Sequence, residues 1–219
     1  MNSVRHLYVH IPFCPSICPY CAFHVLRANK TQADRFIESL LTEFRSIAND
    51  LDAATIFLGG GTPTALSTEM LEELVSILLL RKKPATSPFP ICKAGATPAN
   101  PPVRASDALA LQFPGHDEKS GLNNASNHPQ QEVTIECNPS TLSRQKAAAL
   151  LALGVNRLSI GAQSFDPSVL QTLGRAHPVA AIHQCVATAR EAGFANINLD
   201  LIFGVPGQTL DSWRSTLLD

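Results

Sequence analysis

The sequence has 219 residues, with 17 basic and 18 acidic side chains and a formal net charge of −1. This balance favours neither nucleic acid nor a membrane surface as a partner, and no apolar run approaches the roughly 18 residues of a membrane-spanning helix. The length predicts one domain with a substantial core. Six cysteines do not form a disulfide framework in a chain of this size, and the five residues before the first expected strand are too short for a targeting peptide. We therefore expect a cytoplasmic protein.

The first part of the chain alternates apolar runs with helical periodicity. The expected elements are a strand over 6–11, a helix over 31–49, a strand over 54–58 and a helix from Ser67 to about residue 80. The first run reads as a buried strand and ends at Pro12. Apolar side chains recur every three or four positions in both helices, and Thr31 is the expected N-cap of the first.

Residues 82–130 interrupt this alternation. The segment holds eight of the sixteen prolines, several Asn and Ser, and no sustained periodicity. Such a composition does not bury enough apolar surface to order a chain. We expect a flexible insertion within the domain, with at most one helical turn over 108–113, and an insertion of this length is tolerated because loop-closure entropy grows slowly with length.

The alternation then resumes to the end of the chain. The expected elements are a strand over 132–137, a helix over 143–153, a strand over 156–161, helices over 167–173 and 178–192, a strand over 196–203, and a helix from about residue 209. Five strands, each followed by helix and without hairpin signals, predict an α/β fold with a parallel sheet and right-handed crossovers. A doubly wound sheet and a curved partial barrel both fit this pattern.

Cys14, Cys18 and Cys21 lie in one short loop directly after the first expected strand. Their spacing allows three sulfurs to face a common centre. Three thiolates leave one iron of a [4Fe-4S] cluster without a protein ligand. Structural zinc, with His10 or His24 as a fourth ligand, and free or disulfide-bonded cysteines are alternatives. The other cysteines, Cys92, Cys137 and Cys185, are expected to be ordinary thiols.

Further candidate residues follow the other strands, at the edge of a parallel sheet where ligands bind. Residues 59–63, Gly-Gly-Gly-Thr-Pro, lack side chains that would obstruct a ligand. A tight turn is the simpler explanation, and a phosphate loop lacks the expected Gly-Lys-Ser/Thr. Glu136, Gln163 and Asp200 are polar groups that need partners, either within the core or in a ligand such as a ribose. The planar guanidinium of Arg175 can donate two parallel hydrogen bonds to a carboxylate.

Taken together, these motifs resemble the radical S-adenosylmethionine (SAM) superfamily, and within it the oxygen-independent coproporphyrinogen III oxidase family. The resemblance starts at Leu-Tyr-Val-His-Ile-Pro-Phe-Cys14 and the CxxxCxxC spacing, and covers nearly the whole chain outside 82–130. It implies an open (β/α)6 barrel, here without its last strand. It also implies that Cys14, Cys18 and Cys21 hold a [4Fe-4S] cluster whose open iron binds SAM.

The resemblance also assigns contacts to the cofactor. Tyr20 would lie near the adenine, the glycine run would bind the amino group of SAM, and Arg175 would bind its carboxylate. The positions implied to contact SAM are Tyr8, Tyr20, Gly60, Gly61, Thr62, Glu136, Gln163, Arg175 and Asp200.

Two departures indicate a branch within the family. The oxidases carry a fourth cysteine, as CxxxCxxCxC, where this chain has Phe23, and they have a longer segment before the first strand. Both features look like the HemW-type haem chaperones, which implies haem, haem-accepting proteins and an electron donor as partners. Oxidation of coproporphyrinogen III and a zinc-stabilised binding protein without redox chemistry are the alternatives. Because the sequence stops at Asp219 within a helix, we expect a fragment of a longer barrel.

Overall fold

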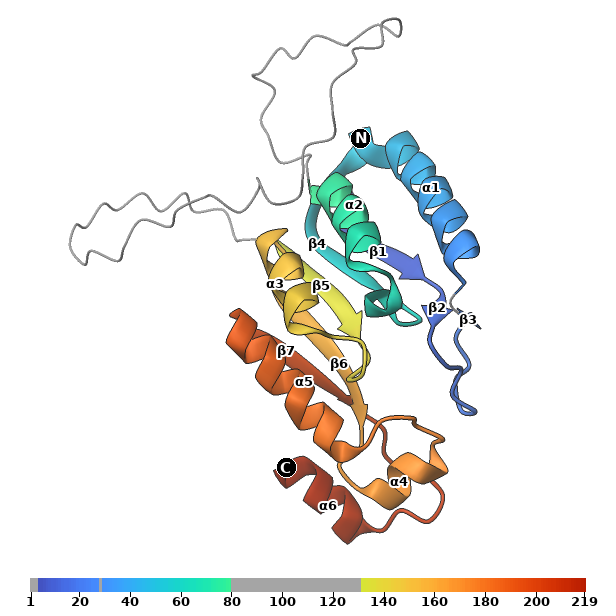
Figure 1. Cartoon of the computed structure of the whole chain (residues 1–219), viewed down its shortest axis with the longest axis vertical. Coiled ribbons are helices and arrows are strands. Elements are labelled where there is room, and N and C mark those ends of the chain that lie inside the picture. Colours follow the sequence, from blue (N-terminus) through green and yellow to red (C-terminus); the bar gives the residue numbers. More distant parts are fainter. Residues whose placement is uncertain (1–3, 28, 80–130) are drawn as a thin grey trace, which may run out of the picture. The chain divides into compact units, whose positions relative to one another are not determined.

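The computed structural model describes residues 4–27, 29–79 and 131–219. Within these ranges the main sheet has five parallel strands in the order β1-β4-β5-β6-β7 (Figure 1). The strands are β1 (Val4–Ile11), β4 (Leu51–Gly60), β5 (Glu132–Cys137), β6 (Arg157–Gln163) and β7 (Asn196–Leu201). Their spatial order follows the chain without reversal, whereas a doubly wound sheet reverses at a switch point. The predicted parallel α/β fold is confirmed, and the strand order favours the partial barrel.

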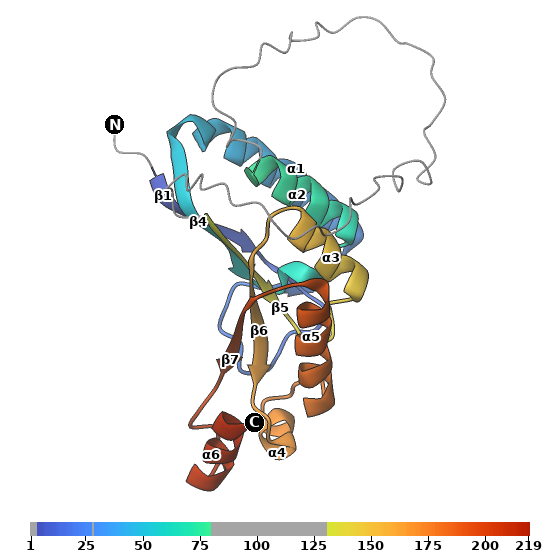
Figure 2. The same ribbon diagram turned by 90° about the vertical axis from the view of Figure 1, so that its left-hand side faces the viewer.

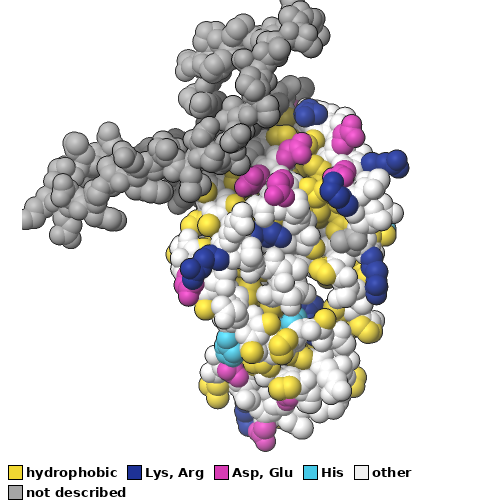
Figure 3. All heavy atoms as spheres, viewed as in Figure 1, with side chains coloured by type: hydrophobic (Ala, Val, Ile, Leu, Met, Phe, Trp, Pro, Cys, Tyr) yellow, Lys and Arg dark blue, Asp and Glu magenta, His cyan; other side chains and the backbone are white. Residues whose placement is uncertain are grey.

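The helices that connect these strands cover one face of the sheet (Figure 2). They are α1 (Lys30–Ile47), α2 (Thr68–Leu79), α3 (Arg144–Ala152) and α5 (Val179–Ala192). The shorter α4 (Pro167–Thr172) and α6 (Leu210–Leu218) lie beyond the ends of β6 and β7, and the 3-10 turns η1 (Ala48–Asp50) and η2 (Pro63–Ala65) flank β4. Seen from the helix side, the surface carries basic and acidic side chains interspersed among apolar ones (Figure 3).

The hydrophobic core lies between the sheet and these helices. Alternate side chains of each strand point to opposite faces, so every second strand residue enters the core. The buried strand residues of this layer include Val9, Ile11, Ile56, Leu58, Val133, Ile135, Leu158 and Ile160. Ile37, Leu41, Leu74 and Leu150 from the helices pack in the same cluster. We call the opposite side of the sheet, without these helices, the open face.

The cysteine loop (residues 14–26) is closed at its base by a second, two-stranded parallel sheet. In this sheet β2 (Phe13–Cys14) pairs with β3 (Leu26–Arg27). The amide of Leu26 also donates a 2.7 Å hydrogen bond to the carbonyl of Pro12. This pair was not predicted, because a strand of two residues is too short to show periodicity.

Several predicted boundaries are corrected. The N-cap of α1 is Asn29, not Thr31, because the Asn29 side chain accepts a 3.3 Å hydrogen bond from the amide of Gln32. The strand expected over 54–58 extends over Leu51–Gly60, and the strand expected to reach residue 203 ends at Leu201. The first strand is not buried on both faces, since Tyr8 on the open face is 55% exposed. Cys92, the turn over 108–113 and the whole predicted insertion over 82–130 lie outside the described residues.

None of the helices in the described ranges combines the length and apolar character that crossing a bilayer requires.

Candidate functional site

A cavity of about 580 Å³ lies where the cysteine loop meets the carboxyl-terminal ends of the main strands. Eleven of the twelve residues predicted to bind cluster or cofactor line it. These are Cys14, Cys18, Cys21, Tyr20, Gly60, Gly61, Thr62, Glu136, Gln163, Arg175 and Asp200. Tyr8 does not line the cavity; its ring stacks on Phe57, which does, with centroids 6.0 Å apart. The parallel sheet thus gathers residues that are far apart in the sequence.

The three cysteines border this cavity as free thiols. Cys14 is buried, whereas Cys18 and Cys21 are partly exposed. Burial is the main reason why the pKa of Cys14 is raised, and the Thr62 hydroxyl 3.6 Å from its sulfur acts in the opposite direction. Among the described residues, no three Cys, His, Asp or Glu side chains form a ready-made metal site. The assignment of these cysteines as cluster ligands therefore stays a prediction.

His10, one of the two histidines considered as a zinc ligand, has hydrogen-bond partners for its ring within the chain. The Nε2 atom of His10 lies 3.0 Å from the carbonyl oxygen of His24, and its Nδ1 atom lies 3.3 Å from the hydroxyl of Tyr8. Both ring nitrogens of His10 therefore have partners within the chain. This arrangement does not favour His10 as the fourth ligand of a zinc ion.

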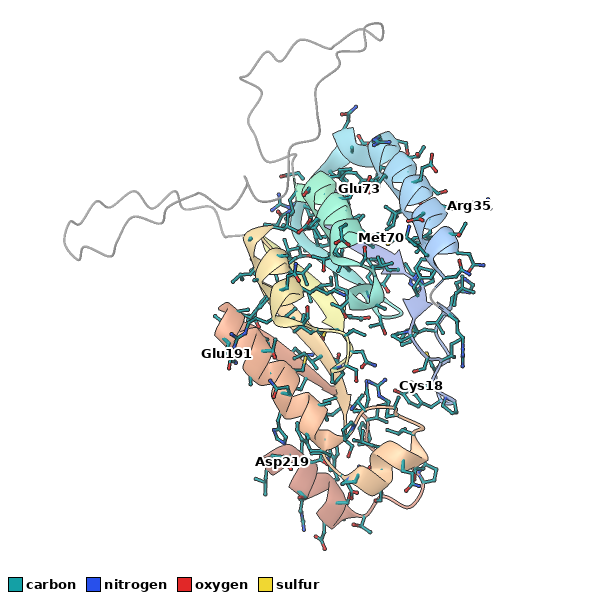
Figure 4. The ribbon with its side chains drawn as sticks, viewed as in Figure 1. Cys18, Arg35, Met70, Glu73, Glu191 and Asp219 are labelled. Carbon is teal, nitrogen blue, oxygen red and sulfur yellow. The ribbon has the colours of Figure 1, made fainter. Side chains whose placement is uncertain are left out.

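Arg175 joins the cysteine loop to β6. Its Nη1 atom lies 3.5 Å from the sulfur of Cys18 and 3.4 Å from the hydroxyl of Tyr20, and its Nη2 atom donates a 2.8 Å hydrogen bond to the carbonyl of Gly161. Figure 4 shows Cys18 on the side of its loop that faces the segment leading out of α4. Arg175 therefore places a positively charged donor beside one of the three sulfurs that are predicted to bind the cluster.

Tyr20 and His177 are the other titratable groups around this arginine. Burial raises the pKa of Tyr20 to about 12, with Arg175 opposing the shift. Burial, followed by the charge of Arg175, lowers the pKa of His177. The Nε2 atom of His177 accepts a 2.9 Å hydrogen bond from Nε of Arg175. His177 is therefore a neutral acceptor that orients the arginine, a role that the sequence analysis did not assign.

The glycine loop (residues 59–63) packs too tightly for side chains. Gly60 has a φ of +109°, and a Cβ atom there would lie 2.5 Å from the ring of His10. A Cβ atom on Gly61 would lie 2.8 Å from the carbonyl oxygen of Phe13. The amides of Gly61 and Thr62 donate to the carbonyls of Ile11 and Phe13, each at 2.8 Å. Packing against the end of β1 thus explains these glycines, and the amides of Gly61 and Thr62 already have partners.

Two carboxylates face the cavity from β5 and β7, the strands on either side of β6. Glu136 accepts a 3.0 Å hydrogen bond from the amide of Gly60. Its pKa is nevertheless raised, mainly by burial and further by the charge of Asp200. Asp200 accepts from the hydroxyl of Ser159 at 3.0 Å and from the side-chain amide of Asn198 at 2.7 Å. Both carboxylates have hydrogen-bond partners within the chain, as expected if they are ordinary polar groups of the core. Both also border the cavity.

Sequence reasoning missed several polar residues of the cavity wall, among them Arg157, Ser159 and Asn198. They occupy alternate positions of β6 and β7, opposite to the apolar positions that enter the core. The signal was present as a period of two in Asn156-Arg-Leu-Ser-Ile160 and Asn196-Ile-Asn-Leu-Asp200. Of the polar members of these two runs, only Asp200 was named as a candidate.

Gln163 lies at an irregular point of the cavity wall. Its φ of +68° is the only positive value for a non-glycine residue in the described part of the chain. The register between β6 and β7 shifts between Ile160 and Gln163, and the amide of Ile202 donates to the carbonyl of Gln163 at 2.9 Å. A Cβ atom on Gly161 would lie 2.8 Å from Nε2 of Gln163. This bulge directs Gln163 toward the cavity at a cost in backbone strain.

Comparison with known proteins gives a consistent result. The family model described as the radical SAM superfamily matches residues 8–219. The chain is 35% identical over 210 residues to the haem chaperone HemW of Bacillus subtilis, covering 94% of this chain and 44% of that protein. It is 29% identical over 216 residues to the oxygen-independent coproporphyrinogen III oxidase of Synechocystis, covering 96% and 37%.

A solved structure is similar over the whole chain. It is the coproporphyrinogen III oxidase HemN of Escherichia coli, described as a radical SAM enzyme, with a TM-score of 0.69 and 27% sequence identity. The match covers 100% of this chain and 42% of that one. The chain thus spans less than half the length of the relatives that it matches.

Proposed function

Because the chain belongs to the radical SAM superfamily, we propose that it is the SAM-binding part of a HemW-like haem chaperone, which binds a [4Fe-4S] cluster and SAM and passes haem to acceptor proteins. The observation that carries this proposal is the convergence on one cavity of the cysteine loop, two carboxylates and Arg175. Activity as a whole protein remains part of the proposal, since the chain spans 44% of its HemW relative from Bacillus subtilis.

The donor set fits an iron–sulfur cluster. Cys14, Cys18 and Cys21 are free, border one space, and have Arg175 and the Thr62 hydroxyl beside two of the sulfurs. Thiolates in contact with hydrogen-bond donors are typical of iron–sulfur sites. A cluster with one open iron position supplies, when bound, the place at which SAM is held and reductively cleaved in this superfamily. An electron donor is then a required partner.

The cavity also fits a nucleoside-sized ligand. Its volume of about 580 Å³ lies within the range of about 300–1,000 Å³ that is usual for small-molecule sites. Glu136 and Asp200 can accept hydrogen bonds from ribose hydroxyls or an ammonium group. The guanidinium of Arg175 can donate two parallel hydrogen bonds to a carboxylate. Binding a carboxylate would require Arg175 to exchange its contacts with Cys18 and Tyr20. Gly60, Gly61, Thr62, Gln163, Tyr20 and, beside the cavity, Tyr8 complete the proposed SAM contacts.

The choice of the chaperone over the oxidase depends on Phe23 and on the relatives. Phe23 stands where the oxidases carry a fourth cysteine; it is 72% exposed and lines the cavity. The chain is 35% identical to HemW of Bacillus subtilis and 29% identical to the Synechocystis oxidase. We propose haem-accepting proteins as partners and the cytoplasm as the compartment, since exposed thiols of this kind suit a reducing environment.

Anaerobic reconstitution with iron and sulfide tests the proposal. We expect about four irons per chain, as a [4Fe-4S] cluster requires, together with broad cluster absorption that changes when SAM is added. Stoichiometric zinc without iron would support the zinc-stabilised binding protein instead and would sink both radical SAM alternatives.

A second assay separates the chaperone from the oxidase. The reconstituted chain is incubated with coproporphyrinogen III, SAM and a reductant, and in parallel with haem and an apo-haemoprotein acceptor. We expect stable haem binding and transfer without decarboxylated porphyrinogen. A decarboxylated product would instead establish the coproporphyrinogen oxidase activity.

A further inference from the structure

Arg157 is a cation in the cavity wall without a carboxylate partner among the described residues. It is the first residue of β6, lines the cavity and is half-buried. Its one hydrogen bond to a described side chain is a long one, from Nη1 to the hydroxyl of Thr134 at 3.4 Å. The ion pairs found between described residues involve Arg5, Lys30, Arg144, His183 and Arg214 instead.

This lack of partners distinguishes Arg157 from the other arginine of the cavity. Arg175 contacts Cys18, Tyr20, Gly161 and His177. A guanidinium carries five donors in a planar fork, and a partly desolvated cation without an anion is unfavourable. The nearby carboxylates of Glu132, Glu136 and Asp200 do not pair with Arg157 in the structure. Glu132 accepts from the hydroxyl of Thr134, Glu136 from the amide of Gly60, and Asp200 from Ser159 and Asn198. Arg157 therefore keeps donors available for an anionic ligand.

The sheet register places Arg157 in a row with two aromatic rings. Tyr8 pairs with Phe57, Phe57 with Thr134, and Thr134 with Arg157. The rings of Tyr8 and Phe57 are stacked with an interplanar angle of 24°. The row of Glu136, Ser159 and Asn198 lies one step nearer to the cysteine loop. Two strand spacings separate Phe57 from Arg157, which amounts to roughly 10 Å.

This geometry matches a flat apolar molecule with a carboxylate at its edge. Phe57 and Phe23 both line the cavity and provide apolar surface, while Arg157 provides the fork that pairs with a carboxylate. Arg175, beside Cys18, lies next to the proposed cluster, so the two arginines serve different parts of the cavity. The carboxylate of SAM belongs near the cysteines, whereas the row that contains Arg157 lies farther from them.

We propose that Arg157 binds a carboxylate of the second ligand of this cavity, and that this ligand is a planar tetrapyrrole carrying propionate groups. The inference rests on the proposed function and names the contact by which the haem is oriented. Arg157 is then a specificity residue that distinguishes a free acid from its ester.

The test uses the reconstituted chain with haemin and with haemin dimethyl ester. Both probes keep the iron and the ring, so any ligation of iron by the protein is common to them, and only the ester lacks free carboxylates. For Arg157→Gln we expect haemin affinity to fall by about tenfold or more, as loss of a charge-assisted pair implies. Binding of the ester and of SAM should equal that of the unmodified chain. The control Arg144→Gln removes an exposed arginine of α3 that pairs with Glu191 on the helix side, and it should change none of the three affinities.

Each other outcome overturns the inference in a recognisable way. Equal haemin affinity in Arg157→Gln and the unmodified chain removes the role of Arg157 and leaves the proposed function intact. A loss of SAM affinity with unchanged haemin affinity assigns Arg157 to SAM. Failure of the unmodified chain to bind either probe overturns the inference together with the haem-chaperone proposal. If Arg157→Gln does not fold, Arg157→Lys replaces it, with a smaller loss for haemin and none for the ester, because lysine keeps the charge without the fork.

Discussion

The two faces of the main sheet are made by the same strands and differ in almost every property. On the helix-covered face, Leu58, Ile135, Leu158 and Ile160 are fully buried in one apolar cluster. On the open face, alternate positions of the same strands carry polar, charged and aromatic groups that line a cavity. Parallel sheets usually bury both faces under helices. The difference shows that one face of this sheet stabilises the fold and the other is available for ligands.

The comparison predicts that substitutions on the two sides have separable effects. Changes on the helix-covered face should lower the free energy of unfolding and disturb ligands only through loss of structure. Changes on the open face should alter ligand binding and leave the fold nearly unaffected.

The largest expected effect is that of Cys18→Ser on the proposed cluster. Two remaining thiolates leave the cluster under-ligated, so we expect essentially complete loss of bound iron. Thermal unfolding of the apo chain should change little, since Cys18 is partly exposed. Iron analysis and absorption spectroscopy after anaerobic reconstitution measure the effect. The matched control is Cys185→Ala, which should retain iron. Cys185 is a buried cysteine on α5 that does not line the cavity. A cluster that survives in Cys18→Ser would refute the ligand assignment.

The next largest effect is expected for Leu158→Ala on the helix-covered face. Leu158 is 0% exposed, and truncation of such a leucine costs about 2–5 kcal/mol of unfolding free energy through lost burial and a cavity. Urea denaturation monitored by circular dichroism measures the change. The control is Asn196→Ala, an exposed position on β7, for which we expect a change within about 0.5 kcal/mol. Equal losses for the two variants would contradict the distinction between the faces.

A smaller effect is expected at the edge where the faces meet. Gly60→Ala should cost about 2–4 kcal/mol, because a positive φ disfavours a side chain and the new Cβ would meet the His10 ring. Gly207→Ala has a φ of +82° and nothing within 4 Å of the added Cβ, so only the backbone cost of about 1–2 kcal/mol applies. The difference between the two variants in chemical denaturation isolates the close packing of the glycine loop. A difference near zero would show that the loop relaxes without cost.

The smallest effect concerns the pH dependence of stability at Glu136. Burial raises the pKa of this carboxyl above its ordinary value of 4.5 in the folded state, so the folded chain binds the proton more tightly than the unfolded chain. Stability therefore falls as pH rises from the unfolded pKa through the raised folded pKa. Glu136→Gln cannot ionise and should lack this part of the decline, while its side-chain oxygen still accepts from the Gly60 amide. Unfolding midpoints across this pH window test the prediction, and parallel curves for both chains would contradict it.

The helix-covered face is also the part of the fold that the sequence predicted well. Apolar periodicity identified all five main strands and the helices between them, because burial against helices selects apolar residues at every second or every third and fourth position. The boundaries differed where local hydrogen bonds decide, as at Asn29, or where a strand continues beyond its apolar run, as β4 does at Asp52 and through Gly59 and Gly60. The two-residue β2 and β3 depend on pairing between distant segments, which periodicity does not report.

The candidate site was predicted only in part, and the signal was the type and spacing of residues rather than apolar periodicity. Cysteine spacing and polar residues at strand ends pointed to Glu136, Arg175 and Asp200, all of which line the cavity. Arg157 was missed because a charged residue at the start of an apolar run looks like a solvent-exposed boundary. Only the register with Thr134 shows that it lies in the cavity wall. The contacts of Arg175 likewise depend on the three-dimensional approach of the cysteine loop.

The small β2–β3 sheet has a consequence for the order of assembly. By joining residues 13–14 to residues 26–27, it fixes both ends of the segment that carries the thiols before any iron arrives. The conformational entropy of closing this ring is lost during folding of the polypeptide, so it does not reduce the affinity for metal. We therefore expect the proposed cluster to bind with little further ordering of the backbone, so that its assembly follows folding as a separate late step.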